Sequence, residues 1–222
     1  MQFMPYGGTI ELNIVSFILL YIMMLFVYVL IIRISNKRHN TRDSTRKYVI
    51  DVIFIFYLLS VLNLTLLPID ILRFDDFRIE MTYWMVGRDY FTTLEIANIQ
   101  VIPFRSIIGT LLAPLHMWRF TLIGIGGNIA LLFPLPIFLC LRSEKKLTLK
   151  KAILIGFCTS LLIEIAQLII NLITHWPNRL VLIDDLILNT FGLFLGYVTY
   201  SKWSSFFEKT VTKINDFFVS SL

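Results

Sequence analysis

The sequence predicts an all-α, polytopic membrane protein, and three observations support this fold class. Hydrophobic residues make up 57% of the 222 residues, and the mean hydropathy is +0.76. Several apolar runs reach the ~20 residues that a helix needs to cross a bilayer. Charged residues concentrate in the intervals between these runs. We therefore expect a bundle of transmembrane helices and not a water-soluble core.

Five segments are predicted to span the membrane. They cover residues 11–34, 48–69, 120–141, 151–173 and 183–200, so residues 1–200 would form one transmembrane domain. Pro134 removes a helix hydrogen bond and is expected to kink the third span. The tail, residues 201–222, has aromatic and aliphatic residues on one helical face and lysines on the rest. We expect it to form an amphipathic helix on the cytoplasmic leaflet.

Lysine and arginine are divided unequally between the intervals. Fourteen lie after the first and third spans and in the tail, and six lie in the remaining intervals. Because basic residues favour the cytoplasmic side, the N-terminus is expected outside and the C-terminus inside. The net charge of +5 therefore reflects membrane orientation, and no nucleic-acid partner is expected. Cys140 and Cys158 fall in or at the ends of predicted helices, which favours packing over a disulfide or a metal site.

The longest interval between spans, residues 70–119, is predicted to be extracellular and partly helical. Within it, residues 107–115 are apolar but too few to cross the bilayer. They would form an interfacial or re-entrant segment, and a simple surface loop is an equally weighted alternative.

Polar residues in the fourth and fifth spans follow narrow helical faces. Each set falls within a stripe of about 60–80° at 3.6 residues per turn. The first set is Gly156, Ser160, Glu164, Gln167 and Asn171, and the second is Asp185, Asn189, Gly192 and Gly196. Ionisable residues are costly in a bilayer and usually face a bundle interior or a wet cavity. We expect the two stripes to face each other or a shared third helix, with the glycines closing the inner end of the contact.

Polar groups on three predicted helices also agree in depth. Asn128, Glu164 and Asn189 would lie ~12, ~14 and ~9 Å from the outer ends of their helices, at ~1.5 Å per residue. The short loop between the last two spans carries Arg179. We therefore predict one outward-facing cavity that is capped by Arg179.

Several motifs match a known family. An E-x-x-Q pair (Glu164, Gln167) is followed by an arginine (Arg179) and then by D-D-x-x-x-N-x-x-G. The last motif comprises Asp184, Asp185, Asn189 and Gly192. Upstream matches are L-T-L-x-P at residues 64–68, a Pro-Phe pair at residues 103–104 and an Asn128…Pro134 run. In this order and spacing the chain resembles the VanZ-like family, and the resemblance covers most of residues 57–200.

The resemblance implies a bacterial cell-envelope protein of the cytoplasmic membrane. VanZ-like proteins are associated with low-level resistance to glycopeptide and lipoglycopeptide antibiotics, teicoplanin especially. The expected partners are therefore membrane lipids, a lipid-linked cell-wall precursor or a lipoglycopeptide.

Three interpretations of the polar residues remain open, and binding is favoured. In the binding interpretation, Arg105 and Arg179 grip an anionic headgroup, because guanidinium matches phosphate bidentately. The amides of Asn128, Gln167 and Asn189 would then bond its sugar or peptide groups.

The second interpretation is an enzyme that acts on a lipid-linked envelope substrate. Glu164 would be the general base, and Asp184 and Asp185 could hold a divalent cation through oxygen ligands. The sequence contains neither H-E-x-x-H nor G-x-S-x-G, so two common catalytic motifs are excluded. The third interpretation is structural: Glu164, Arg179 and Asp185 neutralise one another and fix helix packing.

Overall fold

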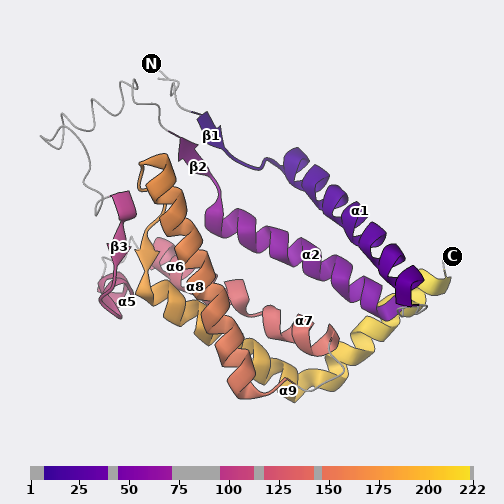
Figure 1. Cartoon of the computed structure of the whole chain (residues 1–222). Helices are drawn as coiled ribbons and strands as arrows, with labels where there is room; N and C mark the ends of the chain where they lie inside the picture. Colours follow the sequence, from indigo (N-terminus) through magenta and orange to yellow (C-terminus); the bar gives the residue numbers. More distant parts are fainter. Residues whose placement is uncertain (1–7, 40–44, 72–95, 113–117, 143–146, 221–222) are drawn as a thin grey trace, which may run out of the picture.

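The computed structural model describes residues 8–39, 45–71, 96–112, 118–142 and 147–220 (Figure 1). Within these ranges the protein is mainly helical, as the sequence predicts. The helices are α1 (Ile14–His39), α2 (Thr45–Leu66), α5 (Arg105–Leu111), α6 (Trp118–Leu132), α7 (Leu135–Arg142), α8 (Leu149–Thr174) and α9 (Ile183–Ser220).

Two short strand pairs lie near one end of the helices. The strands are β1 (Gly8–Ile10), β2 (Ile69–Ile71), β3 (Ile99–Gln100) and β4 (Val181–Leu182). β1 pairs with β2 in antiparallel register, and β3 pairs with β4 in parallel register. These pairs join segments that are distant in the sequence, so they tie the loops at this end to the helix ends.

Four stretches of the described residues are long and apolar enough to cross a membrane. They are Ile14–Ile32, Lys47–Leu66, Leu122–Arg142 and Leu149–Thr174. The fifth predicted span forms the first part of α9 and is not among them, because its two acidic residues and Asn189 lower its hydropathy. The helix count thus differs from the five expected, although the all-helical membrane class is confirmed.

The third span is broken, and the break gives two helices. α6 ends at Leu132 and α7 begins at Leu135, with Pro134 between them. The Pro134 carbonyl accepts hydrogen bonds from the amides of Ile137 and Phe138, 3.1 and 3.2 Å away. Pro134 has no amide hydrogen to donate, so the helix restarts here instead of continuing.

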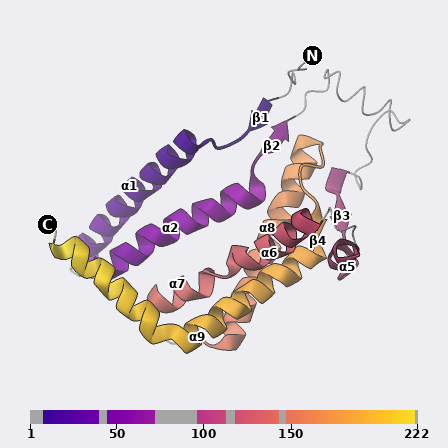
Figure 2. The same cartoon turned by 180° about the vertical axis from the view of Figure 1, so that it is seen from behind.

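α9 combines the predicted fifth span and the predicted tail helix. Its single non-helical residue is Trp203, with φ −115° and ψ 20°. Figures 1 and 2 show α9 running beneath α7 and then towards the ends of α1 and α2. The chain therefore bends close to residue 201, where the sequence changes from apolar to amphipathic.

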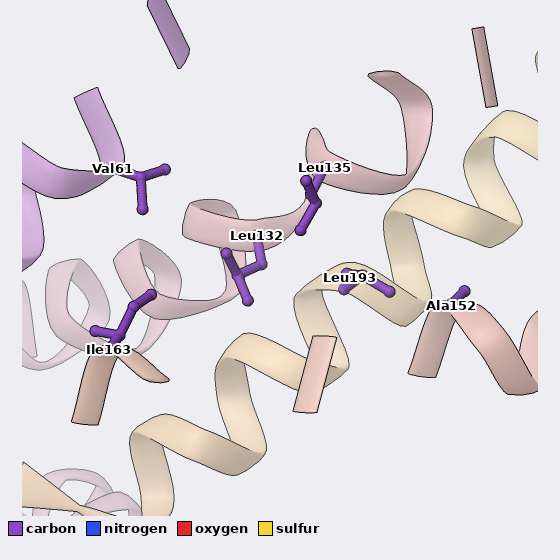
Figure 3. Close-up of a cluster of buried hydrophobic side chains, with 6 residues drawn as sticks. All are labelled: Val61, Leu132, Leu135, Ala152, Ile163 and Leu193. Atoms are coloured by element: carbon purple, nitrogen blue, oxygen red, sulfur yellow. The ribbon is translucent and has the colours of Figure 1, made fainter. Parts of the chain in front are cut away.

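The core lies where α2, α6, α7, α8 and α9 meet. Its six buried residues are Val61, Leu132, Leu135, Ala152, Ile163 and Leu193 (Figure 3). α1 lies apart from this core on the far side of α2 (Figure 2). Phe17 and Tyr21 of α1 meet the ring of Phe56 of α2 edge-on, with centroids 5.6 and 5.4 Å apart. Many apolar side chains on the outer faces are exposed, which suits a surface solvated by lipid.

Glycines set the approach of α9 to α6. A Cβ at Gly192 would lie 1.9 Å from the carbonyl oxygen of Ile129, and one at Gly196 equally close to that of Phe133. Gly156 of α8 instead meets the side chain of Leu193. The expectation that all three glycines close the α8–α9 contact is therefore wrong for the two glycines of α9: Gly192 packs on α6, and Gly196 packs on Phe133 after α6 and on Pro136 of α7. A stripe of small residues reveals a close contact but not which helix makes it.

Candidate functional site

One face of α8 carries the buried polar residues. Ser160, Glu164, Gln167 and Asn171 are all at most 8% exposed. On the outer faces of the same helix, Leu162 and Ile173 are largely exposed. The polar stripe thus points into the bundle, where its groups meet α2, α9 and the loop between α8 and α9.

Two carboxylates meet at the junction of α6, α8 and α9. Oε2 of Glu164 accepts the amide hydrogen of Leu182, at 3.0 Å, just before α9 begins. The carboxylate of Asp185, in the first turn of α9, is close enough to Glu164 to interact electrostatically. Asn128 of α6 donates to Oδ1 of Asp185 at 2.5 Å. Side chains from three helices are therefore linked at one level.

Two buried amides at this junction are only half satisfied. Asn189 donates to Oγ of Ser160 at 3.0 Å, and Gln167 donates to the carbonyl oxygen of Thr65 at 2.9 Å. Within the described part of the chain, Oδ1 of Asn189 and Oε1 of Gln167 have no hydrogen-bond partner. Both atoms are acceptors, as are the neighbouring carboxylate oxygens of Glu164 and Asp185. Two buried donor atoms at the same end of the bundle, Nε2 of Gln100 and Nε of Arg179, also have no partner within the described residues. Unsatisfied atoms of both kinds are therefore buried here.

Asp184 has a different role from its neighbour. Its Oδ1 accepts the amide hydrogen of Phe104, and its Oδ2 accepts those of Ser106 and Ile107 at 2.8 and 3.1 Å. The side chain is 1% exposed. These donors belong to the first turn of α5 and the residue before it, which have no partners within their own helix. Asp184 thus fixes α5 against the start of α9.

Arg179 binds backbone groups and not a carboxylate. Its guanidinium donates to the carbonyl oxygen of Leu67 at the end of α2. Its amide donates to Oδ1 of Asn171 at 3.0 Å, and its carbonyl accepts from the side chains of Asn171 and Asn98. The expected pairing of Arg179 with Asp184 or Asp185 is not formed within the described ranges. Arg179 therefore ties α2 and α8 to the loop between α8 and α9.

Arg105 is the remaining predicted cation. It is the first residue of α5 and is exposed. Within the described ranges it has no ion pair. Residues 113–115 of the predicted interfacial segment lie outside the described ranges.

Asp184 and Asp185, the residues proposed to hold a divalent cation, both accept hydrogen bonds from the protein. Both oxygens of Asp184 face amide hydrogens, and Oδ1 of Asp185 faces the amide of Asn128. In the part of the chain that the structure describes, no group of three His, Cys, Asp or Glu side chains is placed to hold a metal ion.

Three residues that build this end of the bundle were not among the predicted binding or catalytic residues. They are Asn98, Asn171 and Ser160. Asn98 has a positive φ of 52°, and its carbonyl accepts the amide hydrogen of Val181 at 3.0 Å. Asn171 and Ser160 lie on the polar stripe of α8, so the stripe itself was a usable signal. For Asn98, the tolerance of asparagine for left-handed backbone was the available signal.

A second polar cluster lies at the opposite end of the bundle. Asp51 of α2 is paired with Arg142 of α7, with Nε and Oδ1 2.6 Å apart. Tyr28 of α1 also donates to Asp51. This cluster joins α1 and α7 to α2, and the sequence analysis did not identify it.

These features define a class: a multi-pass membrane protein whose intramembrane polar groups are gathered inside the bundle at one end. A scan of family models identifies the family. The model described as VanZ/LLP1 matches residues 54–207. The chain therefore belongs to the VanZ/LLP1 family, and the match includes every residue of the polar junction. Searches of curated proteins and of solved structures gave no significant match.

Proposed function

We propose that this protein binds the polar headgroup of a lipid-linked component of the bacterial cell envelope, at the junction of α6, α8 and α9. The charge distribution supports an outward-facing junction, with the N-terminus outside and the C-terminus in the cytoplasm. The cytoplasmic membrane is the expected location. Members of this family are associated with low-level glycopeptide resistance, teicoplanin especially, which suits a headgroup from the cell-wall precursor pathway or a lipoglycopeptide.

The observation that carries the proposal is the pair of buried amide oxygens that have no hydrogen-bond partner within the described residues. A buried polar atom without a partner costs about 1–3 kcal/mol. Gln167 and Asn189 each bury such an atom, and the carboxylates of Glu164 and Asp185 interact electrostatically nearby. A ligand that brings hydrogen-bond donors would offset this cost. The two amide oxygens therefore favour hydroxyl, amide N–H or ammonium groups, whereas Nε of Arg179 and Nε2 of Gln100 would each take an acceptor.

This preference changes how the headgroup is expected to be held. Arg179 already donates to the backbone of Leu67. In this proposal it therefore holds the surrounding backbone in place and is not the contact for the headgroup. Arg105 is exposed at the start of α5 and would be the contact for a phosphate. Sugar or peptide donors would enter the junction, where Glu164, Asp185 and the amide oxygens accept them.

An enzyme is the second candidate, and one observation favours it. Glu164 is 7% exposed and interacts electrostatically with Asp185. Two carboxylates in one buried site are a common arrangement for general acid–base catalysis. In this version, Glu164 removes a proton from a headgroup that the junction has already bound. Glu164→Gln should then abolish turnover while lipid binding persists.

The test removes the two acceptor atoms without partners, Oε1 of Gln167 and Oδ1 of Asn189, one at a time. Gln167→Leu and Asn189→Leu are purified in mild detergent, and their bound lipids are identified by mass spectrometry. We expect each variant to lose the lipid-linked species that the wild type retains, and cells carrying either variant to lose any teicoplanin resistance that the wild type confers. Asn63→Leu is the matched control, because this α2 amide makes no side-chain hydrogen bond within the described ranges.

Thermal stability separates binding from folding. Gln167→Leu removes the unsatisfied acceptor and also the hydrogen bond to the carbonyl of Thr65. Its stability in detergent should therefore fall by no more than the contribution of one hydrogen bond, about 0.5–1.5 kcal/mol. Folded variants that retain wild-type amounts of the lipid would contradict the proposal. A strong loss of stability in Gln167→Leu would instead support the purely structural interpretation.

A further inference from the structure

An apolar groove runs along α9 on the side that faces α8. It has a volume of about 500 Å³, within the range of roughly 300–1,000 Å³ that is usual for ligand sites. The lining residues are Ile153, Phe157, Ile183, Leu186, Ile187, Thr190, Phe191 and Phe194. The one hydroxyl among them, on Thr190, donates to the carbonyl of Leu186 in its own helix at 2.7 Å. The groove therefore offers its occupant apolar contacts alone.

The groove has the length of one membrane leaflet. From Ile183 to Phe194 the α9 axis advances about 16 Å, at ~1.5 Å per residue. A hydrocarbon core of ~30 Å gives each leaflet about half that depth. The groove begins at the first residue of α9, at the end of the bundle where the polar junction lies, and it extends towards the middle of the bundle. This geometry suits one extended hydrocarbon chain.

The fold brings the backbone of Arg105 close to the residue at which the groove begins. Ile183, which lines the groove, precedes Asp184, whose carboxylate binds the amides of Phe104 and Ser106 on either side of Arg105. The Arg105 backbone is therefore held beside the start of the groove. Its side chain is exposed and without an ion pair within the described ranges. A guanidinium in this position matches a phosphate.

We propose that the groove between α8 and α9 holds one acyl chain of an anionic phospholipid, with its phosphate at Arg105. This proposal deepens the proposed function and rests on it, since the same lipid would present its headgroup to the neighbouring junction. Three features together favour this occupant. The groove is lined by apolar residues, it is about as long as one leaflet is deep, and a basic residue lies near one of its ends. A solvating lipid at an ordinary helix surface needs none of the three to coincide.

The test uses the full-length protein in nanodiscs that contain photoactivatable phosphatidylglycerol or phosphatidylcholine, each with a diazirine on one chain. Cross-linked peptides are mapped by mass spectrometry. We expect phosphatidylglycerol to label residues 153–157 and 183–194 several-fold more than the exposed face of α1. Phosphatidylcholine should label the two regions alike. Equal labelling of both regions by phosphatidylglycerol would overturn the proposal, because it indicates solvating lipid alone.

Two variants and two controls sharpen the result. Ile187→Trp fills the groove and should reduce its labelling several-fold, whereas Leu19→Trp on the exposed face of α1 should not. Arg105→Gln should remove the preference for phosphatidylglycerol and retain chain labelling, and Lys202→Gln at the other end should change nothing. Groove labelling that is insensitive to both Ile187→Trp and Arg105→Gln would refute the assignment.

Two further outcomes identify the cause of a failure. Protein–protein cross-links that block lipid labelling of the groove would assign it to a second copy of the chain, and the proposal would be wrong. Failure of the headgroup proposal is distinguishable, because Gln167→Leu would then retain its lipid-linked species. In that case groove labelling by phosphatidylglycerol would still support the acyl-chain site.

Discussion

Replacing Asp184 with alanine should detach the start of α5 from α9. Asp184 accepts three backbone amide hydrogens, from Phe104, Ser106 and Ile107, and its side chain is 1% exposed. These amides have no helical partners because they lie in or before the first turn of α5. The mutation therefore removes the carboxylate that accepts all three of these amide hydrogens.

The size of the effect follows from the number of bonds. A hydrogen bond to a charged group contributes about 1.5–3 kcal/mol, so three would contribute at least about 4 kcal/mol if none were replaced. Phe104 is exposed, and water can replace its bond. We therefore expect about 3 kcal/mol of local destabilisation, which corresponds to about 100-fold faster amide exchange because 1.4 kcal/mol is tenfold. Asp184→Asn retains one acceptor oxygen and should have a smaller effect.

Hydrogen–deuterium exchange of the protein in nanodiscs measures this prediction directly. Peptides that contain residues 104–107 should exchange faster in Asp184→Ala, while peptides from α2 should not change. Asp185→Asn is the control, since that side chain binds Asn128 and not α5. Wild-type protection of residues 104–107 in Asp184→Ala would show that the carboxylate does not hold α5.

Three further predictions concern helix packing, the polar cluster around Asp51 and the membrane topology. Gly192→Ala would place a Cβ 1.9 Å from the carbonyl of Ile129 and should cost about 1–3 kcal/mol. Its detergent melting temperature should fall, whereas Gly127→Ala, with nothing within 4 Å, should melt like the wild type. Asp51→Ala removes the acceptor of both Arg142 and Tyr28, so we expect a loss of about 1–3 kcal/mol in thermal unfolding; an unchanged melting temperature would contradict this assignment. A cysteine at position 40 should react with a membrane-impermeant maleimide only after cells are permeabilised, and labelling of intact cells would reverse the proposed orientation.

The helices and the polar faces were predictable, because they depend on properties of side chains. Hydropathy locates the spanning segments, Pro134 marks the break between α6 and α7, and the spacing of Ser160, Glu164 and Gln167 marks the buried face of α8. In each case the structure follows from the physical properties of the residue types at those positions. A helix of 3.6 residues per turn converts such a pattern into a face without any knowledge of the neighbours.

The partners of the charged residues were not predictable in the same way. Arg179 and Asp184 look complementary in the sequence, but each of them binds backbone groups instead. Every residue carries the same amide and carbonyl, so a side-chain pattern does not indicate which backbone group lacks a partner. The glycines of α9 illustrate a related limit, because their partner helix depends on how three helices cross.

The motif residues of this family therefore separate into two groups. In lipid, every backbone group of a non-helical segment needs a partner inside the protein. The hydrogen bonds of Arg179 and the three bonds to Asp184 meet this need in the segments around α5 and between α8 and α9, so their charges are explained by the fold. Glu164, Asp185 and Asn189 retain acceptor capacity after their hydrogen bonds are counted, and Glu164 and Asn189 are buried. Stability alone gives no reason to bury that acceptor capacity, since apolar replacement of buried charge is often neutral or stabilising. A donor-bearing headgroup gives such a reason, and it confines the search for function to these three side chains and the amide oxygen of Gln167.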